Sequence, residues 1–542
     1  MGVPRLRRPI FADLVAGISL TGLMVPEGIA YSAIAGLPPS FGVSAAVIGP
    51  LGYSIVGRSR LAVVTATSGA AALLAASIAN AAIPNTPRID CAVALTLLVG
   101  LFFLLGALLR LSALTSFVSR AVLQGFGLGL AITITIRQLP ILLGIAVSQS
   151  APLEIIGSLI AHIGNLNLSS AFLGGGALVF LGISRRLKFV AAGLILTIGS
   201  MLAMHFGPAG HFGIAVAGPL GVELSAPHIP TMAIKDWERL AQLAFPIALV
   251  LLAESWATVR SLAAARGDRV SPEREITALG LANLASALWH GLPVGAGFSI
   301  SNANAQAGSA SRMGAVLAAA AVAIVAIGAG SWIALIPEPV LAAIVISALT
   351  HALSPRPIYS LFRLGRDQWV ALTAAVGVLA LGIVNGLLLA VALSVLGLLR
   401  RLAYPKLSVL GRTGGHDFVD CAVHVDARQI PGVLVIRPNA PLFFGNAEAV
   451  LEEVGQQARD KGASTIVLSL EETDDLDSSA LAAISEFRQA MTAQERVLIL
   501  ARVHDRVRTI LERGGLADLA ATSTFSVDDG VRMAGALGTK KR

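Results

Sequence analysis

The sequence predicts an α-helical membrane protein with many spans that ends in a small α/β domain. Hydrophobic residues make up 55% of its 542 residues, charged residues make up 13%, and the mean hydropathy is +0.77. A soluble globular protein carries about 25% charged residues, so this composition excludes a purely soluble chain and a disordered one. The two cysteines, Cys91 and Cys421, allow no disulfide framework, and their spacing suits no metal site.

The distribution of charge divides the chain into two parts. Residues 1–406 hold 25 Lys+Arg and 13 Asp+Glu, a net charge of +12, whereas residues 407–542 hold 15 and 19, a net charge of −4. The first part is therefore poor in charge, as a membrane domain must be, and the second has the charge density of a soluble domain. We expect a membrane domain over 1–406, a linker over 407–431, an α/β domain over 432–537 and a basic tail over 538–542.

Apolar segments recur along the first part, and we expect about fourteen spans or half-spans. They cover 13–33, 41–56, 66–82, 90–109, 119–143, 168–184, 190–206, 241–259, 274–290, 299–310, 314–336, 338–353, 368–384 and 386–402. An even number places both ends of the membrane domain on one side. Most Arg and Lys residues fall in the loops of that side, which predicts a cytoplasmic N-terminus and C-terminal domain. Because these charges follow the spans and do not cluster in one module, no nucleic-acid partner is expected.

Two carboxylates lie deep inside predicted spans. Glu27 follows Pro26 in the middle of the first span, where proline removes a helix donor. Glu254 lies inside the eighth span, and Thr258 follows one turn later on the same face. An acid at this depth is costly in hydrocarbon and normally faces a cavity or a partner. Both are therefore candidate proton-coupling groups, and Glu254 with Thr258 is a candidate cation site. The structural alternative is a carboxylate that hydrogen-bonds a neighbouring helix.

Two segments have the composition of interrupted helices. The candidate anion-binding residues in them are Thr65, Thr67 and Ser68, which open the third span, and Phe298, Ser299, Ile300 and Ser301, which lie in the tenth. A half-helix that begins inside the bilayer points unpaired N–H groups and a positive dipole end at whatever precedes it. Two such ends facing each other form an anion site, and these two spans correspond if the fold is an inverted repeat of seven plus seven. The alternative is a pair of small-residue packing seams.

Several long stretches resemble the SulP (sulfate permease) family of anion transporters. The resemblance lies in residues 13–60, 119–144, 273–308, 400–420 and 433–450, and it covers nearly the whole chain. It implies an inverted repeat of seven plus seven helices, in which a core of helices 1–4 and 8–11 moves against a gate of helices 5–7 and 12–14. It also implies an anion site between the N-termini of helices 3 and 10. Family members carry sulfate, bicarbonate, chloride, oxalate or dicarboxylates.

Three positions depart from the pattern of many family members. Glu27 stands where many members have Gln, and a carboxylate there resembles the proton-coupled bacterial branch of the family. The tenth helix begins Gly-Phe-Ser-Ile where many members read Ser-Phe-Ser-Arg, so a fixed positive charge near the anion is missing at Ile300. Many members have Gly-Pro where this chain has Thr65-Ala66. Without that pair, the sequence favours a break before the third helix less strongly.

The last part of the chain resembles a STAS domain, the sulfate-transporter and anti-sigma-factor-antagonist module. Predicted strands over 433–438, 464–470 and 497–503 alternate with predicted helices. Asp477, Ser478 and Ser479 match the signature loop of this module and form a candidate regulatory site, because phosphate is favoured at a helix N-terminus. A plain N-cap is the alternative. Such a domain regulates or mediates dimer contacts, so we expect a homodimer.

Together these features predict a secondary active transporter of inorganic or small organic anions, not an enzyme, in a bacterial inner membrane. We expect a proton-coupled symporter with alternating access, in which Glu27 and Glu254 carry the coupling, and we expect no cofactor. Four alternatives remain open. They are an anion exchanger, an uncoupled anion channel, a sodium-coupled symporter that uses Glu254 and Thr258, and a signalling scaffold that works through the STAS domain.

Overall fold

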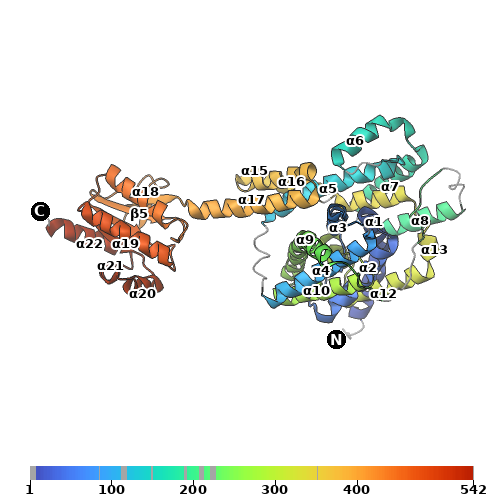
Figure 1. Ribbon diagram of the computed structural model, residues 1–542, viewed down its shortest axis with the longest axis horizontal. Helices are drawn as coiled ribbons and strands as arrows, with labels where there is room; N and C mark the ends of the chain where they lie inside the picture. Colours follow the sequence, from blue (N-terminus) through green and yellow to red (C-terminus); the bar gives the residue numbers. More distant parts are fainter. Residues whose placement is uncertain are drawn as a thin grey trace, which may run out of the picture. The chain divides into compact units, whose positions relative to one another are not determined.

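The computed structural model describes residues 8–84, 86–110, 119–147, 151–187, 192–206, 213–219, 227–350 and 352–540. These residues form two compact units, Met1–Ser394 and Val395–Arg542 (Figure 1). Each unit has its own apolar core.

The first unit is almost entirely helical. Its helices are α1 (Arg8–Ala35), α2 (Pro39–Val56), α3 (Ser68–Ala81), α4 (Arg88–Leu108), α5 (Arg120–Leu143), α6 (Pro152–Ala161), α7 (Leu168–Arg186), α8 (Ala192–Phe206), α9 (Ile234–Arg266), α10 (Pro272–Leu288), α11 (Phe298–Gln306), α12 (Met313–Gly328), α13 (Gly330–Ile333), α14 (Glu338–Leu349), α15 (Arg356–Leu364), α16 (Gln368–Leu381) and α17 (Ile383–Ala403), the last of which continues into the second unit. Each of the fourteen expected apolar segments coincides with a helix, so the prediction of a polytopic helical protein is confirmed. Among the described helices, seven are long and apolar enough to cross a membrane, namely α1, α2, α4, α5, α7, α9 and α17.

The sequence did not predict α6 and α15, which are short helices between the expected spans. The first helix also differs from expectation in one respect, because α1 continues through Pro26 as a single helix. A proline inside a helix removes one hydrogen bond but does not always end the helix, since neighbouring helices can hold the chain on both sides of it.

Close backbone contact fixes α1 against α2. A Cβ atom added to Gly42 would stand 1.8 Å from the carbonyl oxygen of Gly28, so no larger residue fits at this position. The hydroxyl of Ser32 on α1 accepts a hydrogen bond from the amide of Gly42 at 2.7 Å. Helices α1 to α4 pack with α9 to α12, and α5 packs with α7, α14 and α16. The helix that carries Glu27 therefore belongs to a tightly packed group.

Two short strands separate the interrupted helices from the segments that precede them. Strand β1 (Val64–Ala66) leads into α3, and strand β2 (Val294–Ala296) leads into α11. They pair antiparallel, with Thr65 opposite Gly295, and all six residues are buried. Paired strands satisfy the backbone groups that a break inside the membrane would otherwise leave without partners. The expected interruptions before the third and tenth spans are therefore confirmed.

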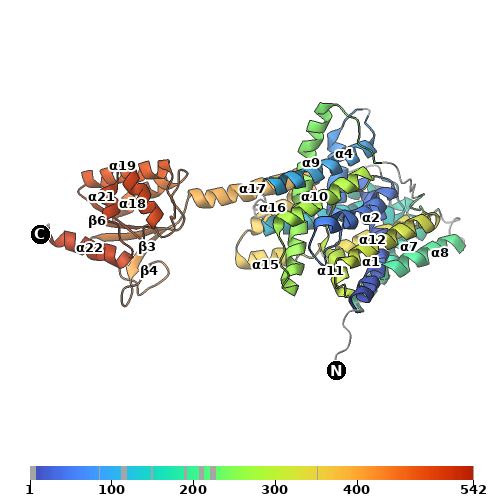
Figure 2. The same cartoon turned by 90° about the horizontal axis from the view of Figure 1, so that it is seen from below.

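The second unit is a five-stranded sheet covered by helices on both faces. The strands lie in the order β4 (Phe418–Asp420), β3 (Leu407–Arg412), β5 (Val433–Pro438), β6 (Thr465–Ser469) and β7 (Val497–Ala501), and the last three are parallel. The helices are α18 (Ala447–Asp460), α19 (Ser478–Ala493), α20 (Asp505–Arg513), α21 (Ala517–Ala521) and α22 (Val527–Lys540). Figure 2 shows α18, α19 and α21 on one face of the sheet and α22 on the other, in agreement with two separate apolar clusters.

The boundaries of this unit differ from those expected. Residues 407–431, expected as a linker, contain β3 and β4, and β3 pairs with β4 and also with β5 outside that range. The basic tail expected over 538–542 is helical at its start, since α22 extends to Lys540. Short strands that follow directly on a membrane helix carry little independent signal in the sequence, because their pairing is decided by tertiary contacts.

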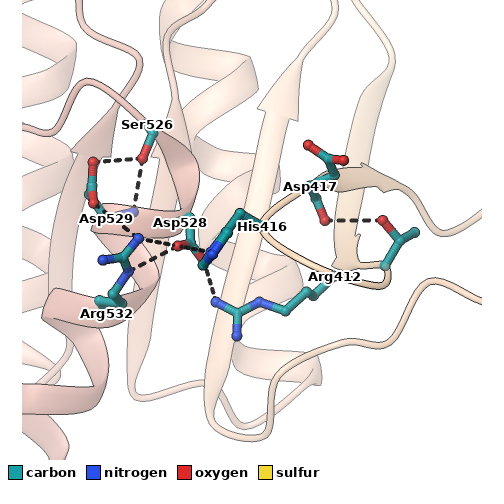
Figure 3. Close-up of polar contacts among 8 residues, drawn as sticks. Arg412, His416, Asp417, Ser526, Asp528, Asp529 and Arg532 are labelled. Atoms are coloured by element: carbon teal, nitrogen blue, oxygen red, sulfur yellow. Dashed lines mark hydrogen bonds and ion pairs between the residues drawn. The ribbon is translucent and has the colours of Figure 1, made fainter.

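One buried carboxylate ties α22 to the end of β3. Asp528, whose side chain is 5% exposed, pairs with Arg412 and accepts hydrogen bonds from His416 Nδ1 at 2.8 Å and from Arg532 Nε at 2.9 Å (Figure 3). The hydrogen bonds from Arg532, together with His416 and the charge of Arg412, lower the pKa of Asp528 from 3.8 to about 2, against the opposing effect of burial. The cluster therefore favours the ionised carboxylate.

This cluster predicts an acid-sensitive contact within the second unit. Because the folded pKa lies below the unfolded one, Asp528 stabilises the unit above about pH 4, and this contribution is lost as the pH falls toward 2. We expect Asp528→Asn to increase amide hydrogen exchange in α22 at pH 7, relative to the parent, and to change it little at pH 2. The matched control is Asp529→Asn, because the Asp529 side chain is 52% exposed. Equal exchange in both variants at pH 7 would contradict the prediction.

Candidate functional site

The first turns of α3 and α11 lie next to each other. Thr67 is the N-cap of α3, and its hydroxyl accepts a hydrogen bond from the amide of Ala70 at 3.2 Å. Gly297 precedes α11 and provides no side-chain cap. A Cβ atom added to Gly297 would stand 3.5 Å from the methyl group of Thr67, so the two helix starts adjoin. Both N-terminal dipole ends are therefore directed toward the same region.

A buried asparagine holds β2 in place before α11. Asn283 on α10 is fully buried, and its Nδ2 donates to the carbonyl oxygens of Val294 at 2.8 Å and Leu279 at 2.9 Å. Its Oδ1 accepts from the amide of Val294 at 2.9 Å, so one side chain satisfies both backbone groups of that residue. Two residues further on, the hydroxyl of Ser255 accepts from the amide of Ala296 at 2.9 Å. Side chains of α9 and α10 thus set the position from which α11 begins.

The segment that enters α3 is held in turn by α11. The hydroxyl of Ser301 accepts a hydrogen bond from the amide of Val63 at 3.1 Å, and Nδ2 of Asn304 donates to the carbonyl oxygen of Leu61 at 3.0 Å. Ser301 is fully buried, and Ile300 beside it is 3% exposed within the apolar core. These two residues of the expected anion site therefore support the scaffold, and Ser299, which is exposed, remains available to a ligand.

Glu254 lies at the start of α3. Its Oε2 accepts a hydrogen bond from the hydroxyl of Thr67 at 3.4 Å, and a Cβ atom added to Gly69 would stand 3.8 Å from the same oxygen. Thr258 lies one turn later on α9 and is 2% exposed. Thr65, also an expected binding residue, is 5% exposed within β1, whereas Ser68 at the start of α3 is partly exposed. The structure thus brings Glu254, Thr67 and Ser68 together at one helix start.

Glu27 faces a cavity beside the other helix start. The cavity has a volume of about 450 Å³ and is lined by Leu23, Glu27, Leu181, Arg185, Ala192, Gly193, Phe298, Ser299, Asn302, Ala303, Gln306, Ile344, Ser347 and Ala348. These residues come from α1, α7, α8, α11 and α14. On α1, Tyr31 lies one turn beyond Glu27. The two acids of the sequence prediction therefore flank the adjoining helix starts.

Sequence reasoning missed several residues of this cavity. Asn302 and Gln306 follow Phe298 at steps of four residues along α11, so their helical spacing placed them on one face, but nothing in the sequence showed that this face lines a cavity. Arg185 comes from α7, and only the tertiary fold brings it to the cavity.

The expected regulatory residues lie at the start of α19 in the second unit. Asp477 is the N-cap, and its Oδ1 accepts from the amide of Ala480 at 2.8 Å. Its Oδ2 accepts from the amide of Phe444 at 2.7 Å, which ties α19 to the segment before α18. Ser478 and Ser479 are both exposed. Asp477 therefore has a structural role, and the two hydroxyls are accessible at the helix N-terminus. In the described part of the chain, no three His, Cys, Asp or Glu side chains could hold a metal ion.

A membrane helix bundle with two half-helices that start side by side, behind paired strands, defines a class of transporters with discontinuous helices. The model of the sulfate permease family matches residues 10–375, and the model of the STAS domain matches residues 424–528. The chain belongs to the sulfate permease family and carries a STAS domain. It is therefore a multi-pass anion transporter and not an enzyme, which confirms the resemblance seen in the sequence.

Named relatives and solved structures agree with this assignment. A "Probable sulfate transporter" of Mycobacterium tuberculosis is 32% identical over 527 residues, which cover 94% of this chain and 92% of that protein. "High affinity sulfate transporter 2" of Stylosanthes hamata is 26% identical, over 94% of this chain and 81% of that protein. The murine Solute Carrier 26 family member A9 anion transporter in its inward-facing state superposes with a TM-score of 0.89 at 19% identity, over 98% of this chain and 92% of that one. The transmembrane domain of a cyanobacterial bicarbonate transporter, BicA, superposes with a TM-score of 0.60 at 20% identity. This match covers 72% of this chain and 98% of that one.

Proposed function

We propose that this protein is a secondary active transporter of a small oxyanion, with sulfate as the first candidate, that binds the anion at the adjoining starts of α3 and α11. The observation that supports this proposal is the uncapped start of α11 in a cavity, with Ser299 exposed beside it. A helix N-terminus carries the equivalent of about half a positive charge and several N–H donors without intrahelical partners. Sulfate is the substrate in the printed names of the curated relatives, and bicarbonate and dicarboxylates are the other candidates.

The donors available to the anion are fewer than the sequence suggested. The hydroxyl of Ser301 is fully buried beneath the cavity-facing residues of α11 and is out of a ligand's reach, and Thr67 donates to Glu254. The remaining donors are the hydroxyls of Ser299 and Ser68 and the backbone amides of the first helical turns. Phe298, which is 46% exposed, contributes an apolar wall. Such a site favours a small anion that accepts several hydrogen bonds.

Proton coupling through Glu27 is the second part of the proposal. Glu27 lines the same cavity as Ser299, so a charged carboxylate there would repel the anion. Protonation of Glu27 removes that repulsion, and the proton and the anion then favour each other's binding. Glu254, hydrogen-bonded to Thr67 at the other helix start, is a second proton-binding group. A sodium site formed by Glu254 and Thr258 is the alternative coupling site, because both residues belong to one face of α9.

The larger architecture is also part of the proposal. Helices 1–4 and 8–11 of the fourteen spans would form a moving core, and helices 5–7 and 12–14 a gate, arranged as an inverted repeat of seven plus seven. The cavity fits this division, because its lining combines α1 and α11 of the core with α7, α8 and α14 of the gate. We place the protein in a bacterial inner membrane as a homodimer, with both ends cytoplasmic. Ser478 and Ser479 would serve regulation through the STAS domain.

Transport by the purified full-length protein in liposomes tests this function. We expect radiolabelled sulfate to accumulate above its electrochemical equilibrium when the outside is acidic, and bicarbonate and succinate to compete in proportion to their affinity. A sodium gradient without a pH gradient should not drive accumulation. Accumulation with sodium alone would replace the proton by sodium as the coupling ion. Flux that never exceeds the equilibrium of the anion itself would identify a channel or exchanger.

A further inference from the structure

We propose that the cavity contains a second anion-binding station, formed by Arg185 of α7 with the side-chain amides of Asn302 and Gln306 of α11. It takes the same small oxyanion before or after that anion occupies the helix starts. This inference rests on the proposed transport function and adds a binding site to it. The three side chains of the station line the same cavity as Ser299 at the start of α11.

The charges that line the cavity support this assignment. Among the lining residues, Glu27 and Arg185 are the charged ones, and they come from helices α1 and α7. Arg185 is exposed, and its Nη1 donates to the carbonyl oxygen of Ser347 on α14 at 3.2 Å. That contact uses one of five guanidinium N–H groups, so the side chain is oriented and retains donors for a ligand. A guanidinium binds planar and tetrahedral oxyanions through paired hydrogen bonds.

Polar groups of α11 line the same cavity as this arginine. Phe298, Asn302 and Gln306 are spaced by four residues, and all three line the cavity. Each amide side chain supplies two N–H donors. The cavity therefore offers an anion that leaves the helix start both neutral donors and a guanidinium. Ile300 of the tenth span is buried in the apolar core, so the positive charge in the cavity lining comes from Arg185 on α7.

The division of the three station residues between the gate and the core has a mechanistic consequence. In the proposed division Arg185 belongs to the gate, whereas Asn302 and Gln306 belong to the core. When the core moves, the amides travel with the anion and the guanidinium stays behind. The station is therefore complete only while the cavity is open, and it should raise the affinity for anions presented from the cavity side alone.

Cysteine labelling measures the potential in the cavity directly. The test uses the full-length protein with Asn302→Cys, in which Cys91 and Cys421 are replaced by Ser, and compares an anionic with a cationic methanethiosulfonate reagent. We expect Arg185→Gln to lower the rate at which the anionic reagent modifies the cysteine about five-fold. The rate with the cationic reagent should rise by a similar factor, because the positive charge of Arg185 is lost from the cavity. Arg186→Gln is the matched control, since Arg186 is exposed and is not among the lining residues. Gln306→Cys provides a second labelling position.

Sided transport provides the second measurement. With radiolabelled sulfate as the probe, we expect Arg185→Gln to raise the KM from the cavity side about five-fold and to leave the KM from the other side unchanged. Arg185→Lys should restore most of the affinity, because the charge returns. Equal reagent rates in the Arg185→Gln and Arg186→Gln variants, or an equal rise in KM from both sides, would overturn the station. If the parent protein does not transport sulfate, the proposed substrate is contradicted. The ratio of the modification rates with the anionic and cationic reagents would then still test whether Arg185 forms the station.

Discussion

Glu27→Gln is expected to abolish accumulation of the anion driven by a pH gradient while exchange of anion for anion continues. The reason is that Gln keeps the size and hydrogen-bonding capacity of the side chain and removes the group that binds the proton. A difference of about two pH units supplies about 2.7 kcal/mol per proton, which corresponds to about 100-fold accumulation in the parent. The variant should show no accumulation above equilibrium. The measurement is sulfate uptake into proteoliposomes with and without the gradient.

Two further variants make this result specific. Glu27→Asp retains a titratable group in the cavity and should preserve coupling at a lower rate, because the shorter side chain changes its distance from the anion. Glu154→Gln is a matched control, since Glu154 is exposed on α6 and does not line the cavity. Coupling that survives in Glu27→Gln would remove Glu27 from this role. If Glu254→Gln alone abolished it, the second acid would carry the proton.

The outcome also separates the roles of the two acids. Glu27 lines the cavity at the start of α11, Glu254 contacts Thr67 at the start of α3, and the two helix starts adjoin. A change of charge on either acid is therefore felt at both helix starts. Because Thr67 donates to Glu254 and also caps α3, protonation of Glu254 would weaken the contact that holds this hydroxyl. The first half-helix should respond to Glu254 and the second to Glu27.

The membrane fold could be predicted from the sequence because it depends on local composition. Apolar runs marked the spans, and the small and hydroxyl residues around 64–70 and 291–308 marked the interruptions. Helices α6 and α15 were not predicted, because each is short and carries polar residues between its apolar ones. Strand β3 was not predicted, because its pairing with β5 depends on residues further along the chain.

The site was predictable only in part, for a reason that Ser299 and Ser301 illustrate. Both were expected to bind the anion, and both lie in the first turn of α11. Ser299 lines the cavity, whereas Ser301 faces the chain before β1 and accepts from Val63. Two residues separated by two positions on a helix point in very different directions, and the sequence alone does not say which face is open. Arg185 could not be found at all, because it comes from a helix far away in sequence.

The second large effect is expected from Asn283→Ala, which should destabilise the protein and impair anion binding together. Asn283 satisfies both the amide and the carbonyl of Val294, and neither group can reach water, because residue 294 is fully buried. Leaving a buried backbone group without a partner costs about 1–3 kcal/mol, so the loss for the pair is about 2–6 kcal/mol. The measurement is thermal unfolding of the purified protein in detergent, with and without sulfate.

The matched control is another asparagine with a similar local contact. Nδ2 of Asn385 on α17 donates to the carbonyl oxygen of Leu381 at 3.3 Å, four residues back, as Asn283 does to Leu279. Asn385 is exposed and its contact is to a residue only four positions back, so the melting temperature should change little in Asn385→Ala. Equal effects of the two alanine variants would show that the bonds to Val294 contribute nothing beyond the helix contact.

Asn283→Asp distinguishes the donor from the acceptor. The carboxylate can still accept from the amide of Val294, but it cannot donate to the carbonyl oxygens of Val294 and Leu279, and it would be a charge buried without a cation. We therefore expect destabilisation at least as large as in Asn283→Ala. Because β2 precedes the start of α11, sulfate should stabilise both variants less than the parent. A variant that melts earlier yet gains full stabilisation from sulfate would show that β2 does not position the anion site.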